Sequence, residues 1–182
     1  MLELHDYIKV IPNVLDTQSC ENIINNKKYE FTLAKVGAGK VGSHANPKYR
    51  NCYITRIFGE DDNIVYQAVA KSLNKYFETL AQIEPSSSEL GLKGDSGYDF
   101  LKYETGGFYI QHLDDDTDTT RRISMTLFLN EEYEGGEFQF FGDYKVTGKT
   151  GSAIVFPSNF CYPHEILPVK SGTRYSIVTW IF

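Results

Sequence analysis

Cysteine is scarce in this sequence. The 182 residues contain three cysteines, Cys20, Cys52 and Cys161, which lie far apart and form no Cys-x-x-Cys pair. An odd number of isolated cysteines predicts neither a disulfide framework nor a zinc knuckle. We therefore expect a protein of a reducing compartment, the cytoplasm.

Long hydrophobic runs and a signal peptide are also missing. No stretch approaches the roughly 18 consecutive apolar residues of a membrane span. The start of the chain, Met1 to Asp6, lacks both the basic segment and the apolar core of a signal peptide. The sequence predicts a soluble, unprocessed protein with no membrane partner.

Positive charge is in deficit. The chain has 18 Lys and Arg against 24 Asp and Glu, which gives a formal net charge of -6. Because binding to a polyanion depends on clustered Lys and Arg, nucleic acid is not the expected partner. The segment from Phe31 to Gly59 is an exception, since it has no Asp or Glu and contains Lys35, Lys40, Lys48, Arg50 and Arg56.

Aromatic residues are abundant, with 12 Phe and 13 Tyr, and they favour strands. The length suits one well-packed domain and is short for two, so we predict a single domain over residues 1–182. In the first half, Tyr7 to Ile11 has the pattern of a strand. A helix capped by Asp16 or Thr17 follows, and the glycine-rich stretch from Val36 to Ser43 is typical of a loop. A second amphipathic helix begins at Asp61 or Asp62 and ends at Leu80.

From Tyr98 onward the sequence consists of short β-rich runs separated by glycine turns. Many short strands without intervening helices are typical of a sandwich, barrel or jelly roll, here with the N-terminal helices packed on one outer face. The predicted strands are Phe100–Tyr103, Phe108–His112, Ile123–Asn130, Glu137–Phe141, Ser152–Phe156 and Tyr175–Phe182.

One group of residues in this β-rich half is typical of a metal site. His112 and Asp114 are two positions apart at the end of a predicted strand, so their side chains point to the same face. By itself this His-x-Asp is a weak signal, because an exposed strand end leading into Asp115 and Asp116 has the same appearance. His164 could supply a second imidazole, and two His with one carboxylate leave three coordination positions free, as a non-heme ferrous ion requires.

Arg174 lies ten positions after His164 and opens the last predicted strand. A guanidinium can hold the far end of a dicarboxylate through two parallel hydrogen bonds, which a lysine cannot reproduce. The alternative is an ion pair at the surface, worth about 0–1 kcal/mol. The fixed offset from a candidate ligand favours the first interpretation.

Taken in order, these motifs resemble those of the Fe(II)/2-oxoglutarate-dependent dioxygenases, specifically the prolyl 4-hydroxylase-like branch. The resemblance covers about Tyr98 to Phe182. Besides His-x-Asp, His164-Glu165 and Gly172-Thr173-Arg174-Tyr175, the matching motifs are Phe100-Leu101-Lys102-Tyr103, Phe108-Tyr109, Leu127-Phe128-Leu129-Asn130, Tyr133-Glu134-Gly135-Gly136-Glu137-Phe138 and Gly151 to Pro157.

The resemblance implies a double-stranded β-helix core at about 98–182, a jelly roll, with the helical support and a substrate loop at about 1–97. It implies iron on His112, Asp114 and His164, the C5 carboxylate of 2-oxoglutarate on Arg174, and O2 as the oxidant, with ascorbate as a further candidate cofactor. Tyr103 would line the co-substrate pocket, and Tyr109 and Trp180 would lie close to the substrate, although buried aromatics are more often simple core. Leu127 and Phe128 are further candidates for the pocket lining. Phe128 stands where some prolyl hydroxylases have a tyrosine, and others have lysine where Arg174 stands.

The substrate is less well defined than the chemistry. A peptide or protein with a prolyl residue to be hydroxylated is favoured by the closeness of the motifs. A dioxygenase acting on a free amino acid, a small molecule or a nucleobase, and a metal-binding jelly roll without catalysis, are the alternatives. The basic segment from Phe31 to Gly59 is either a lid that closes over an extended, acidic peptide or a solvated loop.

Overall fold

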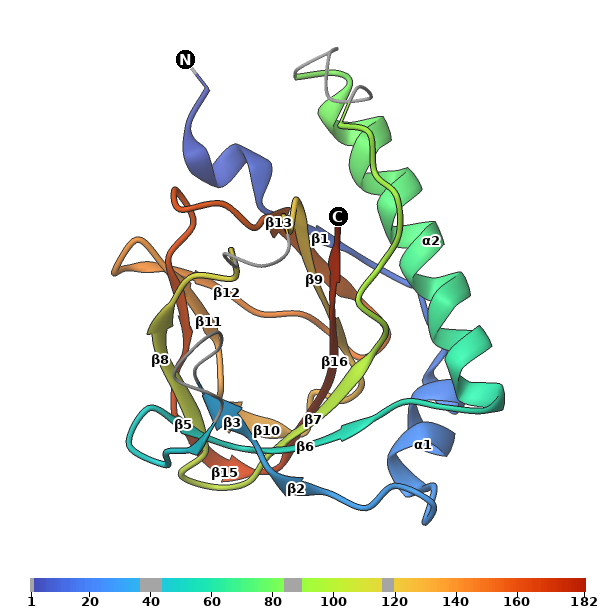
Figure 1. Cartoon of the computed structure of the whole chain (residues 1–182), viewed down its shortest axis with the longest axis vertical. Coiled ribbons are helices and arrows are strands. Elements are labelled where there is room, and N and C mark those ends of the chain that lie inside the picture. Colours follow the sequence, from blue (N-terminus) through green and yellow to red (C-terminus); the bar gives the residue numbers. More distant parts are fainter. Residues whose placement is uncertain (1, 37–43, 84–89, 116–119) are drawn as a thin grey trace.

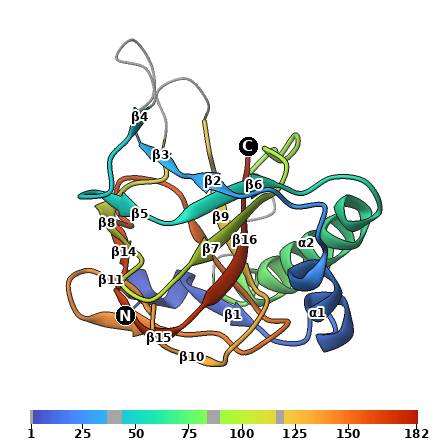
Figure 2. The ribbon, with the colours of Figure 1, turned by 90° about the horizontal axis from the view of Figure 1, so that it is seen from below.

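The computed structural model describes residues 2–36, 44–83, 90–115 and 120–182. In this part of the chain, two antiparallel sheets face each other and enclose the interior of a jelly roll, with two α-helices together on one side (Figures 1 and 2). The predicted architecture, mainly β with the N-terminal helices on one face, is confirmed.

The larger sheet has seven strands. Their order is β1 (Lys9–Ile11), β13 (Ala153–Pro157), β9 (Ile123–Phe128), β16 (Arg174–Ile181), β7 (Asp99–Tyr103), β6 (Tyr53–Arg56) and β2 (Thr32–Leu33).

The facing sheet has five strands, in the order β12 (Tyr144–Val146), β11 (Phe138–Phe140), β14 (His164–Ile166), β8 (Phe108–His112) and β5 (Arg50–Asn51). Two further pairs complete the described strands: β10 (Tyr133–Gly135) with β15 (Val169–Gly172), and β3 (Lys35–Val36) with β4 (His44–Ala45).

The central strands of the larger sheet are apolar because both of their faces are covered. Every residue of β9 is buried. Its odd-numbered side chains, including Met125 and Leu127, belong to the core cluster under the helices. Phe128 belongs to the second cluster, between the sheets. The structure therefore has two apolar layers, one on each side of the larger sheet.

Helix α1 (Thr17–Asn25) begins where the sequence predicts. Asp16 precedes it, and its carboxylate accepts a hydrogen bond from the backbone N–H of Ser19 at 2.8 Å. Helix α2 (Glu60–Leu80) has three acidic residues in its first turn, at the positive end of the helix dipole. Its buried residues, Val65, Ala68, Val69 and Tyr76 among them, pack in the cluster that covers the outer face of the larger sheet.

The predicted long strands are present within a few residues of their expected ends, whereas several short strands were not predicted. The missed strands have two to four residues, and they include β14, which carries His164. Periodicity cannot identify elements of this length. The predicted strand Tyr7–Ile11 is also only partly right, because a 3-10 helix (Leu4–Tyr7) precedes β1. Except for Val36, the predicted loop from Val36 to Ser43 lies outside the described residues, and with it Lys40. Asp116 also lies outside them.

Within the described residues, no helix combines the length and the apolar character that crossing a bilayer requires.

Phe100 links the helical layer to the larger sheet and generates a stability prediction. Its side chain is fully buried, and its ring lies 5.4 Å from the ring of Tyr29 and 5.0 Å from that of Phe31, measured between centroids. We expect Phe100→Ala to lower the free energy of unfolding by about 3–5 kcal/mol, because it leaves a cavity in the core.

Chemical denaturation followed by circular dichroism measures this loss. Phe160→Ala is the matched control, since the Phe160 side chain is 75% exposed and its removal should change the stability by less than about 0.5 kcal/mol. Equal losses in the two variants would contradict the assigned packing.

Candidate functional site

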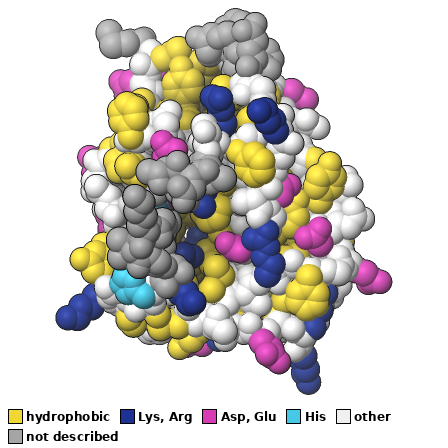
Figure 3. Space-filling model, viewed as in Figure 1, with side chains coloured by type: hydrophobic (Ala, Val, Ile, Leu, Met, Phe, Trp, Pro, Cys, Tyr) yellow, Lys and Arg dark blue, Asp and Glu magenta, His cyan; other side chains and the backbone are white. Residues whose placement is uncertain are grey.

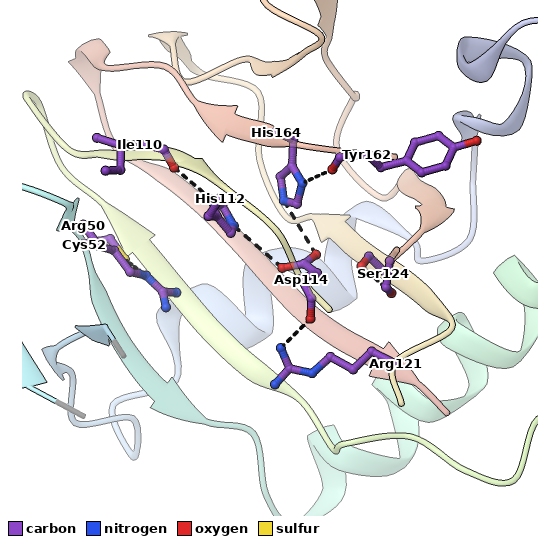
Figure 4. A network of polar contacts seen from close by, with 10 residues as sticks. Arg50, Cys52, Ile110, His112, Asp114, Arg121, Ser124, Tyr162 and His164 are labelled. Atoms are coloured by element: carbon purple, nitrogen blue, oxygen red, sulfur yellow. Dashed lines mark hydrogen bonds and ion pairs between the residues drawn. The ribbon is translucent and has the colours of Figure 1, made fainter. Parts of the chain in front are cut away.

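Strands β8 and β14 bring the two candidate histidines together. His112 is the last residue of β8, His164 is the first of β14, and the two are direct partners in the antiparallel register. Directly opposed residues of an antiparallel pair point to the same face of the sheet. Asp114 follows β8 by two residues, and Figure 4 shows its carboxylate pointing toward both imidazoles.

The three side chains form a compact set of metal-binding atoms. One ligand atom from each of His112, Asp114 and His164 lies within 4.8 Å of the others. The Nε2 atom of His112 is 3.7 Å from Oδ1 of Asp114, and Nε2 of His164 is 3.6 Å from Oδ2. A single divalent ion between them fits this donor set, which is that of a facial triad.

Backbone carbonyl groups orient both imidazoles. Nδ1 of His112 lies 2.9 Å from the carbonyl oxygen of Ile110, and Nδ1 of His164 lies 3.1 Å from that of Tyr162. A carbonyl oxygen can only accept, so each Nδ1 must carry the hydrogen and donate it. This leaves the lone pair of each Nε2 directed at the carboxylate, where a metal ion would sit.

The charge states of the site also suit a metal. Burial lowers the pKa of His112 to about 4, helped by the neighbouring His164, so its imidazole is neutral at pH 7. Burial raises the pKa of Asp114, but the two histidines, the Ser124 hydroxyl and the Trp180 indole outweigh this effect and lower the pKa below its usual value. A neutral imidazole and an ionised carboxylate are the forms that bind a metal.

Arg174, the first residue of β16, is buried in the same interior. Its side chain is 1% exposed, and its Nη1 donates a hydrogen bond to the Ser176 hydroxyl at 2.8 Å. Its Nε and Nη2 are buried without any partner in the described part of the chain. Burying a charge with two unmatched donors is costly unless an anion binds there. The residues present therefore fit a carboxylate, bound through two parallel hydrogen bonds.

A cavity of about 390 Å³ joins the metal-binding cluster to Arg174. Tyr103, Tyr109 and Trp180 all line it, as the sequence predicts. Tyr109 stacks on His112, with ring centroids 3.6 Å apart, and the guanidinium carbon of Arg174 lies 5.2 Å from the Tyr103 ring. The apolar part of the wall includes Leu101, Phe138, Phe156, Ile166 and Val178.

The predicted position of Leu127 in the cavity wall is wrong. Its side chain points to the opposite face of β9 and packs in the core under the helices, because side chains alternate along a strand. Phe128 faces inward, 5.5 Å from the guanidinium carbon of Arg174, but lies behind the cavity surface. Asp115 is exposed at the rim, whereas Asp114 is buried, as the alternation of side chains predicts.

Several residues of the cavity belong to no sequence motif. Lys35, Arg50 and Arg121 line it, and the first two belong to the basic segment from Phe31 to Gly59. The basic composition of that segment is the feature of the sequence that could have indicated Lys35 and Arg50. Lys40 lies outside the described residues, and Arg56 instead pairs with Asp99 at 2.8 Å. The lid hypothesis therefore stays a prediction.

Comparison with known proteins agrees with the geometry of the site. Residues 98–182 match the model of the 2OG-Fe(II) oxygenase superfamily. A PKHD-type hydroxylase of Gloeothece citriformis is 30% identical over 188 aligned residues, covering 96% of this chain and 77% of the relative. A PKHD-type hydroxylase of Alteromonas mediterranea is 45% identical over 64 residues, covering 32% of this chain. That match and the one to a relative from Delftia acidovorans span 27% and 41% of the relatives' lengths.

Solved structures share the fold. A prolyl-4-hydroxylase of Pseudomonas putida superimposes with a TM-score of 0.71 at 24% identity, covering 96% of this chain and 91% of the other. A Trichoplax adhaerens prolyl hydroxylase, solved in complex with a peptide fragment of hypoxia inducible factor, gives a TM-score of 0.68 at 21% identity. It covers 97% of this chain and 84% of the other.

The position of Asp114 generates a prediction about metal binding. We expect Asp114→Ala to weaken Fe(II) binding by roughly a hundredfold or more, because the one carboxylate of the cluster is lost. Competition with a chromophoric chelator under anaerobic conditions measures the affinity. Asp115→Ala is the matched control and should stay within about twofold of the wild type, since Asp115 is exposed. The register is wrong if the two variants lose affinity equally.

The unmatched donors of Arg174 generate a second prediction. We expect Arg174→Lys to raise the dissociation constant for 2-oxoglutarate about tenfold or more while Fe(II) affinity changes by less than about twofold. The reason is that the lysine ammonium is a point charge, whereas the arginine guanidinium can make two parallel hydrogen bonds to one carboxylate. Calorimetric titration of the anaerobic protein measures both constants, and Arg122→Lys, at an exposed position, is the matched control. A parallel loss of Fe(II) affinity in Arg174→Lys would argue against the assigned role.

Proposed function

Because the chain belongs to the 2OG-Fe(II) oxygenase superfamily, we propose that it hydroxylates a prolyl residue of a peptide or protein, with Fe(II), 2-oxoglutarate and O2. The observation that carries this proposal is the pair of buried donors on Arg174 that have no partner among the described residues and line the same cavity as His112, Asp114 and His164. A dicarboxylate that binds Arg174 at one end and the metal at the other accounts both for the two donors of Arg174 and for their position in the same cavity as the candidate metal ligands.

When bound, the metal and 2-oxoglutarate would supply the oxidation, the decarboxylation to succinate being coupled to insertion of one oxygen atom of O2 into a C–H bond of the substrate. Everything else is the task of the protein. His112, Asp114 and His164 would hold the metal. Arg174 orients the co-substrate from its far end.

The walls of the cavity keep the reaction away from water. Phe138, Phe140 and Phe156 surround His164, with ring centroids 4.9–5.9 Å from its imidazole. Leu101, Ile166 and Val178 extend this apolar lining. Tyr109 and Trp180 lie in the cavity wall and would hold the substrate carbon close to the metal.

The choice of a prolyl peptide is supported by the names of the relatives. Two solved neighbours are prolyl hydroxylases, and one of them is in complex with a peptide. The alternatives remain a free amino acid, a small molecule or a nucleobase as substrate. The formal charge of -6 disfavours a nucleic acid. A non-catalytic metal-binding protein would leave the buried charge of Arg174 without a purpose.

The remaining assignments are part of the same proposal. We propose that residues 1–182 act as one catalytic unit, with ascorbate as an accessory reductant. A reducing cytoplasm is the proposed location, supported by Cys20, Cys52 and Cys161, all of which are free. Such a compartment also keeps iron ferrous.

The proposed reaction is tested by product analysis. We expect protein purified anaerobically and loaded with Fe(II) to release succinate from 2-oxoglutarate in air, and proline-containing peptides to raise this rate several-fold. Mass spectrometry should find one hydroxyproline for each additional succinate. Free L-proline, other free amino acids and single-stranded oligonucleotides are parallel arms.

Asp114→Ala is the negative control and should release no succinate above background. Stimulation by a free amino acid or an oligonucleotide alone would replace the prolyl peptide by that substrate class. Absence of succinate in every arm would contradict the enzymatic function altogether.

A further inference from the structure

Arg50 lines the cavity, and the proposed function so far gives it no role. It is the first residue of β5, the edge strand of the five-stranded sheet, and its register partner is Tyr109. The guanidinium carbon lies 4.7 Å from the centroid of the Tyr109 ring, and that ring stacks on His112 at 3.6 Å. Figure 4 shows Arg50 and Cys52 beside the metal-binding cluster. These contacts place a cation near His112, which in the proposed function is a metal ligand beside the substrate.

The charge of Arg50 has no counterion in the described part of the chain. Its hydrogen bond there runs from Nε to the thiol sulfur of Cys52 at 3.2 Å, and no described carboxylate lies within 4.0 Å of its nitrogens. Neighbouring cations differ in this respect, since Arg56 pairs with Asp99 and Lys102 pairs with Glu104, each at 2.8 Å. A guanidinium stays charged at any physiological pH. Two of its nitrogens therefore remain available for an anion from outside the described chain.

The charge balance of the cavity also favours an anionic group on the substrate. Its described lining has four cations, Lys35, Arg50, Arg121 and Arg174, against the carboxylates of Asp114 and Asp115. A divalent metal and a doubly charged co-substrate cancel each other, so the positive excess persists when both are bound. On the face seen in Figure 3, Lys and Arg side chains lie around a central hollow. This local excess contrasts with the formal net charge of -6.

Two of these cations already have other contacts. Arg174 faces the far end of the co-substrate in the proposed function. Arg121 donates a hydrogen bond to the backbone oxygen of Asp114 at 2.9 Å and lies over the Trp180 ring. Lys35 is exposed, whereas Arg50 is partly buried and held against Tyr109. Arg50 is thus the cation best placed to recognise a group on the substrate.

We infer that Arg50 binds a carboxylate of the substrate, so that the preferred peptides carry this group within about two residues of the hydroxylated proline. The inference rests on the proposed function. The 4.7 Å from Arg50 to the Tyr109 ring and the 3.6 Å from that ring to His112 put the guanidinium carbon no more than about 8 Å from the His112 ring. An extended chain advances about 3.3–3.6 Å per residue. One arginine fork in a cavity matches one carboxylate, whereas a nucleic acid requires a row of cations along its backbone.

The experiment uses the full chain loaded with Fe(II) and 2-oxoglutarate, and matched peptides blocked at both ends. Each peptide has one proline among Gly and Ala, with Glu at one of the two positions on either side, and its counterparts have Gln or Lys there. A further pair ends one residue after the proline with a free or an amidated carboxyl group. Hydroxyproline formation gives kcat/KM. Titration of the Mn(II)-loaded protein without O2 gives the dissociation constants of peptide and 2-oxoglutarate.

We expect the wild type to prefer a peptide with Glu, or with a free carboxyl end, over its neutral counterpart by about tenfold or more at one position. The two arms distinguish a side-chain carboxylate from a terminal one. Arg50→Gln should abolish the preference in both kcat/KM and binding, and Arg50→Glu should reverse it in favour of Lys. A merely structural role cannot produce this reversal. Lys48→Gln removes a charge from the same basic segment at an exposed position outside the cavity, and it should retain the preference.

Several results overturn the inference. Equal rates for the Glu and Gln peptides, together with equal rates for the free and the amidated ends, overturn it and leave the proposed function standing. An equal loss of preference in Lys48→Gln assigns the effect to the general charge of the basic segment. A larger loss of 2-oxoglutarate affinity than of peptide affinity in Arg50→Gln assigns Arg50 to the co-substrate. Hydroxylation of no proline peptide, or stimulation by oligonucleotides alone, removes the proposed function and the inference together.

Discussion

The antiparallel pairing of β8 with β14 is the contact on which the rest of the site depends. It sets His112 directly opposite His164, two residues that are far apart in the sequence. Asp114 joins them because β8 ends at His112 and the chain continues for two residues along the same face. The backbone carbonyl groups of Ile110 and Tyr162 then fix both rings, so the same strands that position the imidazoles also set which nitrogen faces the Asp114 carboxylate, where a metal would bind.

The sequence was sufficient for the long elements and for the residues that belong to motifs. Strands such as β9 and β16 and helix α2 are long enough for their periodicity to be recognised, and Asp114 could be distinguished from Asp115 because side chains alternate in a strand. Strand β14 has three residues, so His164 could be placed only through its spacing to other motif residues. Leu127 was misplaced for a different reason, since alternation gives two faces but does not say which of them the helices cover.

Arg50 illustrates what local sequence cannot give. It belongs to no motif, and the register between β5 and β8, a contact between strands more than fifty residues apart, is what brings it over Tyr109. The basic composition of the segment from Phe31 to Gly59 indicated an excess of positive charge, but not which of its side chains face the cavity. Arg56 comes from the same segment and has its charge matched by Asp99, because it lies on a different sheet.

In the proposed function, the two donors of Arg174 that have no partner in the described part of the chain also make the stability of the protein depend on its co-substrate. The folded chain must bury this guanidinium, whereas the unfolded chain hydrates it freely, so a ligand that satisfies the donors shifts the folding equilibrium. At a co-substrate concentration of about 100 times its dissociation constant, the added stability is about 2.7 kcal/mol. A fall in that concentration would increase the unfolded fraction, the form that proteases attack.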